Sequence, residues 1–280
     1  MKEVTIKMDN RAIGYIDSGI GGLTVVKQAL EQLPNEQIYY IGDTARMPYG
    51  ARTQEEVLRF TWQMVNYLLK KEIKLLVIAC NTATAAALPD LQAKLSIPVI
   101  GVIQPGVTAA LQATKNQHIG VIATKGTVES LAYQNKLEQQ GVGISVEQLA
   151  TPDFVTIVEN YDYTDFSARQ RVLAQLAYFD HKNIDTLILG CTHFPLLAPF
   201  IKEAMGEKVT LINSGAEAVT LVQQALQNND IMHDLSVVDH SMDMYCTTGS
   251  VERFAEVGGK WLEMAHMPVR HLDILNDQLV

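Results

Sequence analysis

Short apolar runs rich in β-branched residues alternate along the chain with longer segments of helical periodicity. Strands separated by helices are typical of βα units, in which the strands form a parallel sheet. The pattern therefore predicts an α/β fold. The expected strands lie at 13–17, 37–42, 74–79, 98–103, 118–123, 185–190 and 209–213.

Two of the intervening segments carry apolar residues at spacings of three and four, which places those residues on one face of a helix. Both segments therefore predict crossover helices whose apolar face covers the sheet. The first stripe is Leu23, Val26, Leu30 and Leu33, and the second is Val57, Phe60, Met64, Val65 and Leu68.

Three segments in the first half of the chain have counterparts, in the same order, in the second half. Apolar strands resemble one another, so chance alignment is an alternative explanation, but the shared order favours two related halves. The matching pairs are 13–16 with 119–122, 75–83 with 186–194, and 98–106 with 209–217.

The repeat predicts two pseudo-symmetric parallel-sheet domains of the flavodoxin-like type, with an active site in the cleft between them. We expect the first domain to comprise residues 1–103 plus 215–280, because the C-terminal segment returns to it. Residues 104–214 then form the second domain.

Two cysteines fall in register in the repeat, each at the end of an expected strand. Cys80 is followed by Asn81 and Thr82, which can begin a helix, and we expect Cys191 to have the same placement. Ligands of open parallel sheets bind beyond the carboxyl ends of the strands, so both thiols should point into a crevice. Free cysteine is more often a small buried apolar residue, and this is our interpretation of Cys246, which has no counterpart in the repeat.

Paired thiols in mirrored halves suit the inversion of a carbon stereocentre, which needs a base on one face and an acid on the other. Disulfide exchange is disfavoured because neither cysteine belongs to a C-x-x-C pair. Cys191 and His193 could offer two zinc ligands, but no second pair at metal spacing follows, so we expect no metal.

The loop after the first expected strand, at 17–22, is rich in glycine. It fails the dinucleotide-binding pattern because Thr24 stands where that pattern requires glycine. We interpret it as a nest of backbone N–H groups for a carboxylate, with Asp17 placed to hold or polarise a nearby thiol. In the alternative interpretation Asp17 merely caps the helix.

Composition and charge argue against some binding partners and indicate the cellular compartment. A net charge of −9 without a run of Lys and Arg argues against nucleic acid. Residues 1–16 mix both charge signs and contain no long apolar stretch, so we expect neither a signal peptide nor a membrane span. Three cysteines cannot form a disulfide framework, which fits a cytoplasmic protein.

Four motifs resemble those of the glutamate racemases, in the aspartate/glutamate racemase superfamily. They are IDSGIGGLTV at 16–25, GDTARMPYG at 42–50, VIACNTATA at 77–85 and LILGCTHFPLL at 187–197. The resemblance implies that Cys80 and Cys191 are the two acid/base thiols, with Asp17, His193, Asp43 and Glu159 in supporting catalytic roles. The substrate contacts that it implies are Asp17, Ser18, Pro48, Tyr49, Gly50, Asn81, Thr82, Thr124, Thr127, Thr192 and His193.

The resemblance further implies a homodimer that interconverts L- and D-glutamate without a cofactor and supplies D-glutamate for peptidoglycan synthesis, and hence for cell-wall biogenesis and cell shape. An aspartate racemase would use the same thiols in a slightly shorter pocket. A non-catalytic amino-acid binding module would also consist of two α/β halves around a cleft.

Overall fold

The computed structural model describes residues 8–160, 163–234 and 239–280. Residues 1–7 lie outside the described residues. They are the first part of the segment 1–16, for which we expect no signal peptide. Strands from residues 13–101 and 244–271 form one sheet, and strands from residues 118–213 form another. The domain limits given above stay a prediction.

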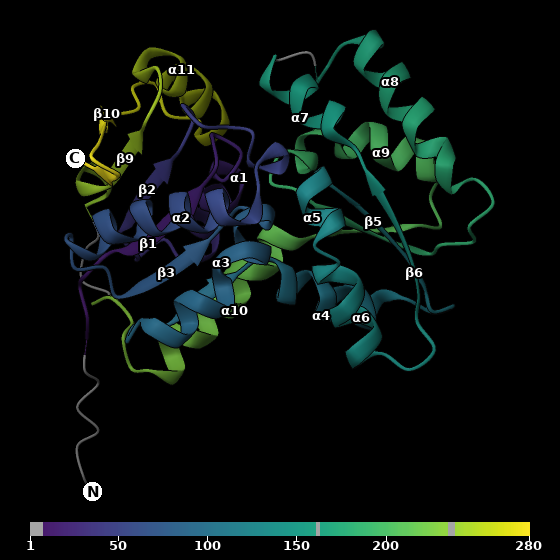
Figure 1. Ribbon diagram of the computed structural model, residues 1–280, viewed down its shortest axis with the longest axis horizontal. Coiled ribbons are helices and arrows are strands. Elements are labelled where there is room, and N and C mark those ends of the chain that lie inside the picture. Colours follow the sequence, from purple (N-terminus) through teal and green to yellow (C-terminus); the bar gives the residue numbers. More distant parts are fainter. Residues whose placement is uncertain (1–7, 161–162, 235–238) are drawn as a thin grey trace, which may run out of the picture.

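The first sheet has six parallel strands in the order β10-β9-β2-β1-β3-β4 (Figure 1). Strands β9 and β10 come from the C-terminal segment, and β9 pairs with β2. The strands are β1 (Ile13–Asp17), β2 (Ile38–Gly42), β3 (Leu75–Ile78), β4 (Val99–Gly101), β9 (Met244–Thr247) and β10 (Val269–His271).

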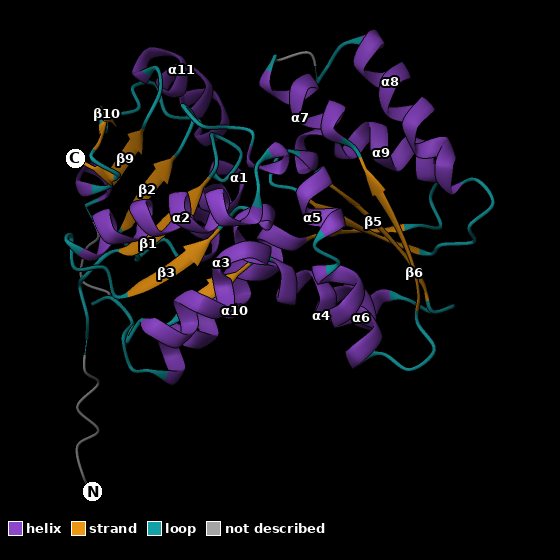
Figure 2. Ribbon diagram, in the orientation of Figure 1, coloured by secondary structure: helices purple, strands orange, loops and turns teal. Residues whose placement is uncertain are grey.

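The second sheet has four parallel strands in the order β6-β5-β7-β8, which repeats the order β2-β1-β3-β4 of the first (Figure 2). The three pairs found in the sequence therefore occupy equivalent positions, which confirms an α/β fold with two pseudo-symmetric parallel sheets. The strands are β5 (His118–Ala123), β6 (Ser145–Ala150), β7 (Thr186–Gly190) and β8 (Thr210–Asn213).

All seven expected strands are present, although the run 98–103 ends as a strand at Gly101. Its last residue, Ile103, begins α4 instead, and Pro105 fits the first turn of that helix because backbone nitrogens there have no partner within the helix. Helices cover both faces of each sheet (Figure 2). They are α1 (Leu23–Gln32), α2 (Gln54–Leu69), α3 (Asn81–Lys94), α4 (Ile103–Ala113), α5 (Lys125–Glu129), α6 (Ala132–Gln140), α7 (Pro152–Glu159), α8 (Phe166–Leu176), α9 (Ala198–Met205), α10 (Ser214–Asn228) and α11 (Val251–Leu262).

Both predicted apolar stripes form crossover helices, α1 and α2. Helix α2 begins with a capping box, in which the Thr53 hydroxyl accepts from the backbone N–H of Glu56 and the Glu56 carboxylate accepts from that of Thr53. On β1, Ile13 and Tyr15 enter one apolar core and Ile16 enters another, as alternation along a strand requires. The first of these cores continues into the second half of the molecule, so the two halves share apolar packing.

One helix joins the two halves from below the sheets. Helix α10 packs against α1 of the first half and against α4 of the second (Figure 1). It follows β8 directly, and its first turn is capped by the side chain of Asn213, which accepts from the backbone N–H groups of Gly215 and Ala216. The chain thus returns to the first half along a helix that contacts both.

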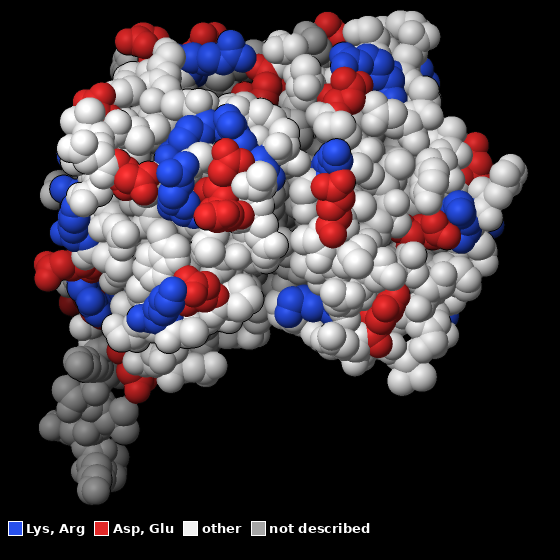
Figure 3. All heavy atoms as spheres, in the orientation of Figure 1, with Lys and Arg blue, Asp and Glu red and all other residues white. Residues whose placement is uncertain are grey.

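Acidic and basic side chains alternate over the face of the molecule drawn in Figure 3, and no large patch of one sign gathers there. No helix in the described ranges combines the length and the apolar character that crossing a bilayer requires.

Candidate active site

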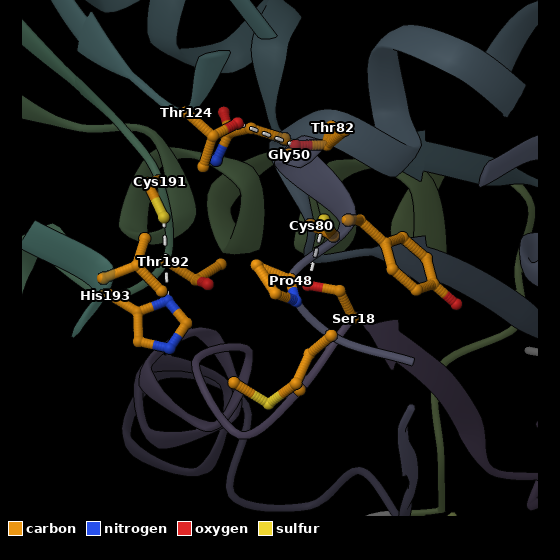
Figure 4. Close-up of a pocket in the computed structure, with 14 residues that line it drawn as sticks. Ser18, Pro48, Gly50, Cys80, Thr82, Thr124, Cys191, Thr192 and His193 are labelled. Atoms are coloured by element: carbon orange, nitrogen blue, oxygen red, sulfur yellow. Dashed lines mark hydrogen bonds between the residues drawn. The ribbon is translucent and has the colours of Figure 1, made fainter. Parts of the chain in front are cut away.

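A pocket lies where the two halves meet, at the carboxyl ends of β1, β3 and β7 (Figure 4). Cys80 and Cys191 lie on opposite sides of it, one from each half. The pocket is lined by Ser18, Gly19, Met47, Pro48, Tyr49, Gly50, Cys80, Asn81, Thr82, Thr124, Val155, Cys191, Thr192 and His193.

Cys80 follows β3 and caps the N-terminus of α3. Its sulfur accepts a hydrogen bond from the backbone N–H of Ala83 at 3.4 Å and donates one to the Ser18 hydroxyl at 3.6 Å. Burial, reinforced by the negative charge of Asp17, raises the pKa of Cys80 to about 12. Cys80 is therefore a thiol at neutral pH.

Cys191 follows β7, the strand equivalent to β3, and has a different set of neighbours. Its sulfur lies 3.6 Å from Nδ1 of His193, and Nε2 of His193 lies 2.6 Å from a carboxylate oxygen of Glu159. Burial acts to lower the pKa of His193, but the hydrogen bonds with Cys191 and Glu159 outweigh it and raise that pKa well above its ordinary value. A protonated imidazole can thus stand beside Cys191 at neutral pH.

The two thiols therefore differ in a way that the repeat did not predict. Helix α3 begins directly after Cys80, whereas a short 3₁₀ helix follows Cys191 and α9 begins only at Ala198. The carbonyl oxygen of Thr192 accepts a hydrogen bond from the Thr24 hydroxyl at 2.9 Å instead of one from an amide in the next turn. The expectation that Cys191 also precedes an α-helix was wrong. The imidazole of His193, and not the N-terminus of an α-helix, lies beside the Cys191 sulfur.

The glycine-rich loop after β1 packs against the turn that follows Cys191. Asp17 is fully buried, accepts from the backbone N–H of Gly19 at 2.9 Å and faces the Thr192 hydroxyl at 3.4 Å. A Cβ atom at Gly21 would lie 2.4 Å from the Thr192 hydroxyl and 2.7 Å from Nδ1 of His193. Glycine at this position therefore allows the two halves to approach closely.

Three threonine hydroxyls join the halves on another side of the pocket. Thr82, in the first turn of α3, lies 2.9 Å from the Thr124 hydroxyl and 3.1 Å from that of Thr127. Thr124 and Thr127 are themselves 3.1 Å apart. Thr82 and Thr124 line the pocket, while Thr127 is fully buried behind them. These hydrogen bonds fix the positions of the three hydroxyls where the halves meet.

Asp43 lies behind the pocket and holds one of its walls. Its carboxylate accepts from the hydroxyl of Tyr49, which lines the pocket, from Nε of Arg46 at 2.7 Å and from the Thr248 hydroxyl at 2.7 Å. Thr248 follows β9, so the C-terminal segment takes part in this support. The peptide bond between Met47 and Pro48, which both line the pocket, is cis.

Most of the residues expected at the site line the pocket, and the other four lie one layer behind it. Asp17 and Asp43 are fully buried, Thr127 supports two other threonines, and Glu159 contacts the far side of His193. Their roles in the reaction stay predictions. Three lining residues were not expected, namely Gly19, Met47 and Val155.

Of these three, Gly19 belongs to the loop already singled out, and Met47 precedes the expected Pro48. Val155 is an apolar residue of α7 with no chemical signal in the sequence. Cys246 is fully buried in an apolar core and does not line the pocket. In the part of the chain that the structure describes, no group of three or more His, Cys, Asp or Glu residues is placed to hold a metal ion.

Comparison with known proteins agrees with this geometry. Residues 13–222 match the family described as Asp/Glu/Hydantoin racemase. A glutamate racemase of Listeria monocytogenes is 51% identical over 265 residues, which cover 94% of this chain and 98% of that protein.

Solved structures give the same result. A glutamate racemase isoform from Bacillus anthracis matches with a TM-score of 0.91 at 43% identity, covering 95% of this chain and 98% of that one. The glutamate racemase of Francisella tularensis, in complex with D-glutamate, matches with a TM-score of 0.87 at 33% identity and the same coverage. The chain therefore belongs to the Asp/Glu/Hydantoin racemase family and, within it, to the glutamate racemases, and it is an enzyme of the isomerase class.

Proposed function

We propose that this enzyme interconverts L- and D-glutamate by direct proton exchange between the substrate and two thiols, without a cofactor. The observation that carries the proposal is the position of Cys80 and Cys191 on opposite sides of one small pocket. The similarity to glutamate racemases, one of them solved with D-glutamate, supports glutamate as the substrate.

In one direction the Cys191 thiolate removes the α-proton of glutamate, and Cys80, which starts as a thiol, donates its proton to the opposite face of the same carbon. The C–H bond that breaks and the one that forms each exchange a proton with sulfur, so no oxidant or reductant is needed. In the reverse direction the two thiols exchange roles. His193 and Glu159 hold Cys191, while Ser18 and the Ala83 amide hold Cys80.

Removal of the α-proton builds up negative charge next to the substrate carboxylate, and donors already aimed at that charge lower the barrier. The hydroxyls of Ser18, Thr82, Thr124 and Thr192 and the amide of Asn81 line the pocket and can supply such donors. Tyr49, held by Asp43, gives a rigid wall against which the substrate can be oriented. The expected contacts of Pro48 and Gly50 are part of the same wall.

We also propose that the enzyme works in the cytoplasm as a homodimer and supplies D-glutamate for peptidoglycan synthesis. The family relation supports these three points. Sedimentation analysis of the purified protein tests the dimer, and growth of a strain depleted of the enzyme, with and without added D-glutamate, tests the metabolic role.

The reaction is tested by incubating the purified enzyme with L-glutamate in D₂O and following both the loss of circular dichroism and the appearance of deuterium at the α-carbon. We expect both signals to reach equilibrium, and L-aspartate to react far more slowly. Binding of glutamate without deuterium exchange would instead identify a binding module, and turnover of aspartate alone would identify an aspartate racemase.

The matched variants are Cys80→Ala, Cys191→Ala and Cys246→Ala. Each of the first two should abolish racemisation, because one face of the substrate loses its acid or base. Cys246→Ala should retain it, because that thiol is buried in an apolar core away from the pocket. Retained activity in either of the first two variants would contradict the two-thiol mechanism.

A further inference from the structure

A chain of buried hydroxyl groups leads from the second half of the molecule to Asn81 in the pocket. The hydroxyl of Tyr133, on α6, donates to the side-chain oxygen of Asn81 at 2.7 Å. The same hydroxyl lies 2.8 Å from the hydroxyl of Ser214, the first residue of α10. Tyr133 is fully buried, and Ser214 is 1% exposed. Neither Tyr133 nor Ser214 is among the residues to which the sequence analysis assigns a role.

The direction of each hydrogen bond follows from the number of protons available. Ser214 has one hydroxyl proton and two neighbouring acceptors, the Tyr133 oxygen at 2.8 Å and the carbonyl oxygen of Leu189 at 3.4 Å. The shorter contact is the stronger hydrogen bond, so Ser214 donates to Tyr133. Tyr133 is then free to donate its own proton to Asn81.

This direction determines which end of the Asn81 amide can serve a ligand. The side-chain amide of asparagine has an oxygen that accepts and a nitrogen with two N–H donors. Because the oxygen is engaged by Tyr133, the nitrogen is the end that Asn81 can present to the pocket that it lines. A carboxylate needs donors, whereas an amide oxygen turned toward it would repel it.

We propose that Tyr133 is a positioning residue that holds the Asn81 amide with its N–H donors toward a carboxylate of the bound amino acid. The proposal rests on the function proposed above. Asn81 begins α3 of the first half, whereas Tyr133 and Ser214 belong to α6 and α10. The amide is therefore oriented only when the two halves are packed together as they are here.

The surroundings of Tyr133 keep it in the donating state. Burial raises the pKa of its phenol above the ordinary value, so the hydroxyl keeps its proton throughout the neutral pH range. A Cβ atom at Gly190 would lie 3.1 Å from the Tyr133 ring, and one at Gly106 would lie 2.4 Å from the Ser214 hydroxyl. Close packing on both residues leaves little room for other side-chain arrangements.

The test is a double-mutant cycle of Tyr133→Phe and Asn81→Ala, measured as kcat/KM for racemisation of glutamate and as the dissociation constant of D-glutamate. Tyr133→Phe keeps the ring and removes only the hydroxyl. We expect it to lower kcat/KM by about 2- to 10-fold, because a typical buried hydrogen bond contributes about 0.5 to 1.5 kcal/mol. In the Asn81→Ala background the same change should have almost no effect, because the amide that Tyr133 orients is gone.

The matched control is Tyr15→Phe. Tyr15 is also fully buried, and its hydroxyl has no hydrogen-bond partner among the described residues, so its loss should leave kcat/KM unchanged. A loss below twofold in Tyr133→Phe, or an equal loss with and without Asn81, would overturn the proposal. If the wild type does not racemise glutamate, the proposed function fails by itself, and the cycle is decided by the dissociation constants.

Discussion

The close approach of the glycine-rich loop to the Cys191 turn makes Gly21→Ala an informative substitution. The added methyl group would lie 2.4 Å from the Thr192 hydroxyl, 2.6 Å from Cε1 of His193 and 2.7 Å from its Nδ1. Ordinary van der Waals contact begins near 3.4 Å. The backbone at Gly21 is not in the left-handed region, so alanine is accommodated locally and the whole effect is steric.

Relief of this overlap requires the Thr192–His193 turn to move by roughly 1 Å. His193 would then lose its position beside the sulfur of Cys191, which it approaches to 3.6 Å. A misplacement of about 1 Å in a catalytic group can cost about 100-fold in rate. We therefore expect kcat to fall about 100-fold, while overpacking lowers the free energy of unfolding by only about 1 to 3 kcal/mol.

The assay compares racemisation by circular dichroism with urea unfolding for Gly21→Ala and for a matched control, Gly14→Ala. A Cβ atom at Gly14 would also be crowded, though less than one at Gly21, at 2.7 Å from Ile73 and 3.0 Å from Leu68, and it would lie in the apolar core away from the pocket. The control should lose stability and keep kcat within about twofold. If Gly21→Ala keeps near-normal kcat, or if both variants lose it equally, the steric argument is refuted.

Two further predictions concern buried ionisable groups. Because the pKa of Cys80 is raised to about 12, only about one molecule in 10⁴ carries the Cys80 thiolate at pH 8. The rate at which iodoacetamide alkylates Cys80, measured by mass spectrometry, should therefore rise about tenfold per pH unit from pH 7 to 10. A plateau below pH 9 would contradict this. Lys74 and Glu36 form an ion pair at 2.6 Å with 0% and 3% of their side chains exposed, so Lys74→Met should lower the free energy of unfolding by about 3 to 5 kcal/mol, measured by urea titration. A decrease of less than 1 kcal/mol in the free energy of unfolding would show that Lys74→Met does not leave the Glu36 carboxylate buried without a partner.

Three of the predicted strands are buried on both faces. In β1, β3 and β7 every residue is buried, and apolar residues fill most positions of each strand. Strand β6 was missed because its side chains are exposed or half-buried and include the polar Glu147 and Gln148, so the sequence shows no apolar run there. Strands β9 and β10 are four and three residues long and, unlike the equally short β3 and β4, lie in no longer apolar run of the sequence.

The candidate site was predictable as far as the repeat reached. Cys80 and Cys191 were located because they fall in register at the ends of equivalent strands. Tyr133 and Thr248 could not be found in this way, because each reaches the site from a distant part of the sequence, Tyr133 from the other half and Thr248 from the returning C-terminal segment. Hydroxyl groups are frequent along the chain, and only their three-dimensional surroundings distinguish these two.

Strand β9 completes the first sheet beside β2, although the entire second sheet intervenes between β4 and β9 along the chain. During synthesis on the ribosome, the inserted half emerges in full before the strand that finishes its host, so β2 waits with one edge unpaired. The half that is translated first is therefore the last to be finished, and a chain stalled before residue 244 would expose that edge to other nascent chains.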